Sequence, residues 1–102
     1  MALAVTAFAC ATERWEPATV TAIERGTARV YGGSNKAMYY TVSTRDRMLT
    51  GVLVSRSRFS DYRILPLSEG QSVEVSLSGS TLRIRSGEKV HKMTLDRERK
   101  LR

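Results

Sequence analysis

Apolar and polar side chains alternate most regularly between Leu67 and Leu95, and this alternation predicts β-strands. Apolar residues occupy every second position of 73–77 and again of 82–84, with polar residues between them. A two-residue period is typical of a strand that buries one face. Upstream, residues 18–46 are rich in threonine, valine and tyrosine and develop no apolar stripe of helical spacing. The pattern therefore predicts an all-β domain.

A two-residue turn at Gly79-Ser80 predicts the pairing of the two most regular strands. Glycine at the first central position suits a type II′ turn because it accepts positive φ without a Cβ clash. Counting outward from this turn, Val75 faces Ile84 and Glu74 faces Arg85. Apolar residues then meet on one face and opposite charges on the other, so the turn and the pattern indicate the same register.

A second turn, at Ser86-Gly87-Glu88-Lys89, leads into the last predicted strand. Met93 and Leu95 share a face with Ile84, which places His91 inward and Val90 outward. In the reverse facing, Val90 would point inward and His91 would be exposed. One apolar residue, Val90, favours this alternative, whereas Met93 and Leu95 favour the first.

The remaining strands are predicted from β-forming residues between turn signals. Of two adjacent tyrosines, Tyr40 shares the parity of apolar neighbours and is predicted to lie in the core, and Tyr39 on the surface. We expect a turn or bulge at Arg25-Gly26, a hairpin of Thr27–Tyr31 and Ala37–Ser43 around the loop 32–35, a turn at Arg45-Asp46, strands at Leu49–Arg56 and Tyr62–Leu67, and a frayed tail after Leu95.

Six or seven short strands with polar turns predict a small antiparallel β-barrel or sandwich. The strand-turn-strand unit of 67–84 resembles that of SH3-like and OB-like barrels, which serve many unrelated functions. The predicted organisation is an export or lipoprotein signal remnant at 1–10, a tether at 11–17, the barrel domain at 18–95 and a charged tail at 96–102. Trp15, in the tether, is expected to cap one end of the barrel.

Composition narrows the possible chemistry. The 102 residues carry 17 basic and 10 acidic side chains, a formal charge of +7, which favours polyanionic partners. One cysteine and one histidine argue against an intrachain disulfide, a metal centre and a His-based relay, and the acids are scattered. We therefore expect no cofactor, no metal and no enzymatic activity.

The first ten residues are uncharged and mostly apolar, and the run is too short to span a bilayer, which takes roughly 20 residues. Such a segment matches the apolar and cleavage regions of an export signal, although a positive start is missing. Ala7-Phe8-Ala9-Cys10 resembles the lipobox of bacterial lipoproteins, with Ala7 where that family usually has leucine. The resemblance implies that Cys10 carries the lipid and that the protein lies in the periplasm or at the outer membrane of a bacterium.

Two other interpretations of this leader stay open. It is also compatible with a plain secretory leader cut near Ala9 or Ala11, and with an N-terminal β-strand of a cytosolic protein.

Two functions follow from these alternatives. The first is a non-enzymatic cell-envelope protein, a small lipoprotein or secreted binding module, that contacts an envelope protein, lipid or polysaccharide. The second is an intracellular, cytoplasmic nucleic-acid-binding protein that uses a basic sheet face. The predicted binding residues are Tyr39, Arg83, Arg85 and Lys92.

Overall fold

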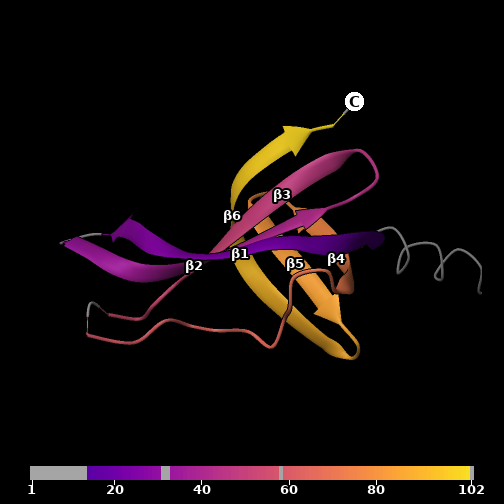
Figure 1. Ribbon diagram of the computed structural model, residues 1–102. Helices are drawn as coiled ribbons and strands as arrows, with labels where there is room; N and C mark the ends of the chain where they lie inside the picture. Colours follow the sequence, from indigo (N-terminus) through magenta and orange to yellow (C-terminus); the bar gives the residue numbers. More distant parts are fainter. Residues whose placement is uncertain (1–13, 31–32, 58, 102) are drawn as a thin grey trace, which may run out of the picture.

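The chain forms a closed antiparallel β-barrel of six strands, as predicted (Figure 1). The computed structural model describes residues 14–30, 33–57 and 59–101. The strands are β1 (Glu16–Val30), β2 (Gly33–Ser43), β3 (Arg47–Val54), β4 (Ser72–Ser78), β5 (Thr81–Ser86) and β6 (Lys89–Lys100). Around the barrel they follow the order β1-β2-β3-β6-β5-β4.

The barrel is assembled from two three-stranded meanders. β1, β2 and β3 pair in chain order, and so do β4, β5 and β6. Two further ladders join the meanders, β1 with β4 and β3 with β6. The described residues of the connection between the meanders, 55–57 and 59–71, form no strand.

The register predicted from the glycine turns is confirmed. Val75 pairs with Ile84 and Glu74 with Arg85, while Ile84 pairs on its other side with His91. Gly79 and Gly87 have φ values of 61° and 63°, and no described residue other than glycine has a positive φ. A positive φ at the first central position alone is the type II′ pattern.

Inward-facing residues of all six strands fill the barrel. Tyr40 is fully buried and Tyr39 is not, as predicted, and Val90 is exposed while Met93 is buried. The Tyr40 hydroxyl accepts a hydrogen bond from the Leu65 backbone N–H (2.9 Å), which ties the connection to the core. The fully buried large side chains are Tyr40, Leu49, Leu82, Ile84, Val20, Val42 and Val75.

Ion pairs join β1, β3 and β6 near the start of β1. Arg47 of β3 contacts Glu16 of β1 at 2.8 Å and Glu98 of β6 at 3.0 Å. The hydrogen bond that Arg47 donates to Glu16 raises its pKa most, burial opposes this, and the hydrogen bond that it donates to Glu98 raises the pKa further. Because its pKa is raised, Arg47 stays charged until far above neutral pH. The titration of Arg47 therefore adds no pH dependence to the stability near neutrality. Trp15, expected to cap one end of the barrel, is half-buried and lies against the Arg85 guanidinium.

The free edge of β1 is covered by the end of the connection. A bulge between Val20 and Ala22 interrupts the β1–β2 register. At this place the Val20 N–H donates to the Gln71 carbonyl (2.9 Å) and the Gly70 N–H donates to the Val20 carbonyl (2.7 Å). The Ile23 N–H donates to the Glu69 carboxylate (3.0 Å). These bonds satisfy backbone groups that β4, which reaches only Thr19, does not.

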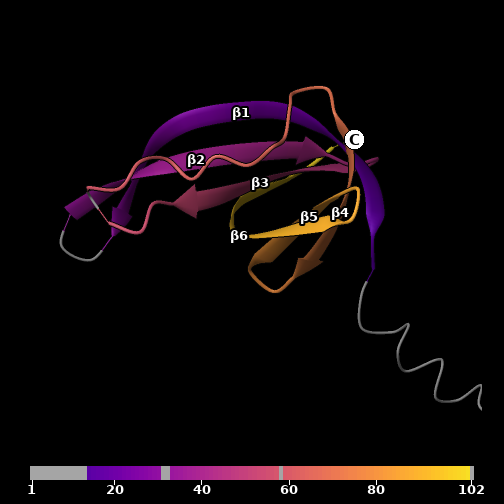
Figure 2. The same cartoon turned by 90° about the horizontal axis from the view of Figure 1, so that it is seen from below.

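The distal part of the β1–β2 hairpin projects beyond the other strands (Figures 1 and 2). In this part, β2 is the strand that pairs with β1, with Thr27 opposite Lys36 and Arg29 opposite Ser34. The described residues of 55–66 lie beside those of 25–30 and 33–37. These three segments together are called the arm. The arm is the main departure of the molecule from a simple barrel.

The predicted hairpin is present, but the turn or bulge expected at Arg25-Gly26 is wrong and the loop expected at 32–35 is shorter. β1 runs without a turn through Gly26, where a Cβ would lie 2.9 Å from the Tyr39 ring, so glycine makes room for this ring. Part of the expected loop 32–35 belongs to β2. Its buried Asn35 donates to the Ser55 carbonyl (3.0 Å), so its polar side chain serves the connection and not a turn. Residues 31 and 32 lie outside the described part.

Two later predictions also need correction. The segment 62–67 is not a strand, because its backbone is engaged by the Tyr40 hydroxyl and by a local bond from the Leu67 N–H to the Leu65 carbonyl (2.8 Å). The strand after the Arg45-Asp46 turn is present but ends at Val54. The expected frayed tail is part of β6, whose residues to Lys100 pair with β3.

Replacing Gly79 with valine is expected to cost about 1–3 kcal/mol of unfolding free energy, because a β-branched residue is strained at positive φ. No atom lies within 4 Å of a Cβ built at this position, so the loss would report backbone strain alone. Chemical denaturation measures it, with Ser80→Val as the matched control. A loss below a few tenths of a kcal/mol would contradict the type II′ turn.

Candidate binding surface

The four predicted binding residues do not gather on one face. Arg83 and Lys92 are direct partners on β5 and β6. Tyr39 lies on β2, which is separated from β5 by β3 and β6. Arg85 lies farther along β5, opposite Val90. Arg83, Arg85 and Lys92 thus lie on the outer face of two neighbouring strands, and Tyr39 lies apart from them.

Tyr39 and Arg85 are engaged in contacts within the barrel. The Tyr39 hydroxyl donates to the Thr27 carbonyl (3.0 Å), and its ring covers Gly26. Arg85 donates two hydrogen bonds to one Glu74 oxygen (2.6 and 2.9 Å), and its guanidinium lies 4.2 Å from the centre of the Trp15 ring. An arginine that is paired and stacked is less available to a ligand.

Cys10, the predicted lipid attachment site, lies outside the described residues.

His91 faces the barrel interior. It pairs with Ile84, and its Nε2 is buried without a hydrogen bond. A nitrogen without exposed surface is poorly placed to exchange a proton with a bound molecule. Among the described residues, no group of three or more His, Cys, Asp and Glu side chains could hold a metal ion. In the same part of the chain, no helix is long and apolar enough to cross a membrane.

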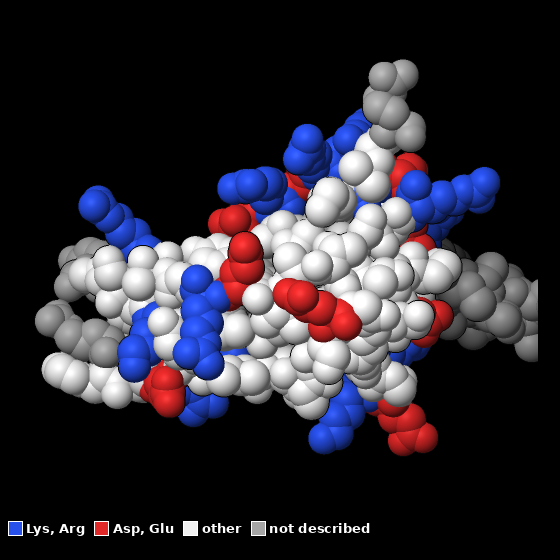
Figure 3. All heavy atoms as spheres, in the orientation of Figure 1, with Lys and Arg blue, Asp and Glu red and all other residues white. Residues whose placement is uncertain are grey.

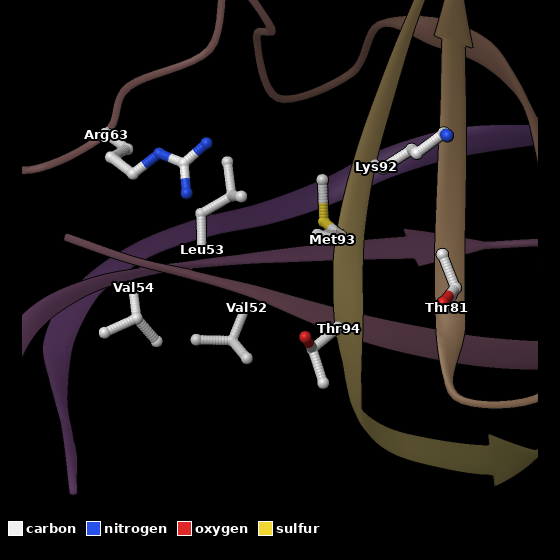
Figure 4. Close-up of a pocket in the computed structure, with 8 residues that line it drawn as sticks. All are labelled: Val52, Leu53, Val54, Arg63, Thr81, Lys92, Met93 and Thr94. Atoms are coloured by element: carbon white, nitrogen blue, oxygen red, sulfur yellow. The ribbon is translucent and has the colours of Figure 1, made fainter. Parts of the chain in front are cut away.

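A cavity of about 420 Å³ opens where β3 and β6 diverge. Their ladder ends at the pair Val52 and Thr94, and each strand continues without the other. Its lining is Val52, Leu53, Val54, Arg63, Thr81, Lys92, Met93 and Thr94 (Figure 4).

Two cations border the apolar part of this cavity. Figure 4 shows the Arg63 guanidinium beside Leu53, with Met93 across the gap. Neither Arg63 nor Lys92 makes an ion pair with a described residue. Arg63 was missed in the sequence because it comes from the connection and lines the same cavity as Lys92 only in the folded barrel.

The arm carries a cluster of cations around one aromatic ring. Arg25 of β1 and Lys36 of β2 lie 5.3 and 5.5 Å from the centre of the Tyr62 ring. Lys36 also approaches Asp61 at 3.8 Å. These contacts hold the connection against the hairpin, so the arm is a packed unit of three chain segments.

Positive charge dominates the arm. Its described residues include one acid, Asp61, and five cations, and Figure 3 shows Lys and Arg side chains over this end of the molecule. The cations are Arg25, Arg29, Lys36, Arg56 and Arg63. Four of them, Arg25, Arg29, Arg56 and Arg63, make no ion pair with any described residue.

The arm also carries the two most exposed large apolar side chains of the described chain. Phe59 is 90% exposed and Ile64 is 63% exposed, compared with 44% for Val90 on the barrel. Exposed apolar side chains on a basic surface are typical of a contact surface, because burying the apolar side chains in a contact removes them from water.

The fold and these surfaces define a small, closed β-barrel with a basic, partly apolar arm. Comparisons with known protein families, with curated proteins and with solved structures find no match for this chain. The function must therefore be argued from the surfaces themselves.

Proposed function

We propose that this protein is a non-enzymatic binding module of the bacterial cell envelope, exported through its apolar leader and tethered by lipid on Cys10. The observation that carries the proposal is that residues 16–100 close the barrel on themselves. The outer strands of the two meanders pair with each other, β1 with β4 and β3 with β6, and these two ladders close the barrel. The apolar residues of the leader are thus not required for barrel closure and are available as an export signal.

The surfaces support binding rather than catalysis. The β3–β6 cavity combines an apolar floor with the cations Arg63 and Lys92, a composition suited to holding an acidic ligand. The projecting arm adds a second basic surface at the end of β1 opposite to Glu16 (Figure 1). The alternative, a nucleic-acid-binding protein, relied on Tyr39 and Arg85, whose contacts within the barrel give it less support.

Lipidation at Cys10 is expected to hold the protein in membranes through a wash with high salt, which releases proteins bound by charge alone. A single acyl chain binds weakly, and lipoprotein maturation supplies the additional chains that stable attachment needs. Fractionation of the native host and the mass of the purified N-terminus test this directly. Cys10→Ser should move the protein to the salt wash.

A matched truncation separates the leader from the barrel. The chain without residues 1–10 should fold with the stability of the full chain and be absent from salt-washed membranes. A Cys10→Ser protein that resists the wash would indicate an uncleaved apolar anchor. A truncated chain that fails to fold would show that the leader is needed by the barrel, which would refute the proposal.

A further inference from the structure

We infer that the arm docks on a bilayer surface rich in anionic lipids, with Phe59 and Ile64 entering the headgroup region and the surrounding cations facing the phosphates. The inference deepens the proposed function, because it gives the envelope module a second membrane contact. It does not depend on lipid at Cys10.

The apolar part of this contact is given by exposure. Phe59 and Ile64 leave 90% and 63% of their surface in water, whereas the other large apolar side chains of the connection, Leu65 and Leu67, pack on the core. Moving an exposed apolar side chain into the interface of a bilayer removes this surface from water. Placement on a projecting arm allows this without a clash between the barrel and the bilayer (Figure 2).

The charged part is given by cations of the same arm, some of them close to these two side chains in the sequence. Arg56 and Arg63 belong to the same connection, and Lys36 lies against its Asp61. Arg56 and Arg63 have no acidic partner among the described residues. Clustered cations are attracted to a negative lipid surface over about one Debye length.

An anionic lipid surface fits the arm better than nucleic acid does. An aliphatic side chain such as Ile64 offers no π face for a base, so its exposure serves hydrocarbon and not stacking. The Tyr62 ring, which could have stacked on a base, is only half-exposed and already has Arg25 and Lys36 against it. Among the described rings of the arm, Phe59 is the one with most of its surface in water.

The test uses the full 102-residue chain carrying Cys10→Ser, which cannot be lipidated, and vesicles of phosphatidylcholine with or without about one third phosphatidylglycerol. Cosedimentation at low salt should show binding to the anionic vesicles and little to the neutral ones. Phe59→Ser should weaken the binding about tenfold, because it removes an aromatic side chain from the contact. Val90→Ser, which truncates an exposed apolar side chain on the barrel, should not weaken it.

A site-specific readout separates the arm from the leader. In the Cys10→Ser background, an environment-sensitive dye on Phe59→Cys should shift to the blue when anionic vesicles are added, and the same dye on Val90→Cys should not. Arg56→Gln with Arg63→Gln should reduce the binding and its salt dependence together.

Three results would overturn the inference: equal binding to neutral vesicles, binding that Phe59→Ser leaves unchanged, or binding to single-stranded DNA with no binding to vesicles. The last would assign the arm to nucleic acid. Because the vesicle assay uses protein without lipid, it can fail while Cys10 is still lipidated in the host, and the reverse also holds.

Discussion

Replacing Ile84 with alanine is expected to lower the free energy of unfolding by about 2–5 kcal/mol. Ile84 is fully buried on β5, between Val75 of β4 and His91 of β6, so the substitution leaves a cavity in the middle of the second meander. Several strands contribute to this part of the core, and relaxation around the cavity would have to move more than one of them. Urea denaturation monitored by Trp15 fluorescence or by circular dichroism measures the loss.

The matched control is Lys92→Ala on β6, since Lys92 is exposed and lies near Ile84 in the sheet. Substitutions at exposed positions are usually within about 0.5 kcal/mol of the parent. Arg83, next to Ile84, is a poorer control because its Nε is buried. Similar losses at positions 84 and 92 would mean that the inward facing of Ile84 is wrong.

Replacing Gly51 with valine is expected to cost about 1–3 kcal/mol or more through overpacking. Gly51 faces the interior opposite Tyr40, where a Cβ would overlap the Met93 sulfur and lie 3.0 Å from Leu82 Cδ2. The Met93 side chain fills the space that the glycine leaves. Thr94→Val on the outer face of β6, which places the same residue type where it is exposed, should have little effect.

A double-mutant cycle makes the Gly51 prediction specific. Met93→Ala alone should destabilise by about 2–5 kcal/mol because it empties the space beside Gly51. Combined with Gly51→Val, the total loss should be smaller than the sum, since the new side chain occupies the vacated volume. Strictly additive losses would show that Gly51 and Met93 do not share this volume.

The second meander could be predicted from the sequence because its register depends on local signals. Each of its two connections is a two-residue turn with glycine at positive φ, and the turn fixes which residues face each other. The pairing of Glu74 with Arg85 followed from this count alone. It also indicated that Arg85 would be neutralised.

The hairpin and the later strand of the first meander were also predicted, but their bounds and the arm could not be, because non-local contacts decide them. Gly26 is explained by the Tyr39 ring on the neighbouring strand and not by a turn. The segment 62–67 has strand-forming residues, yet its backbone partner is the hydroxyl of Tyr40. Arg63 and Lys92 meet at one cavity only because β3 and β6 close the barrel, and a single sequence gives no sign of this pairing.

The division of the barrel into two meanders has a consequence for how the chain folds. Four of the six ladders join strands that are consecutive in the chain, so each meander can form by short loop closures. The β1–β4 and β3–β6 ladders join residues far apart in the sequence, such as Glu16 with Val75 and Arg47 with Lys100. Long-range antiparallel pairing is slow to form. Docking of two preformed halves should therefore set the folding rate, with the bonds from residues 69–71 to β1 forming in the same step.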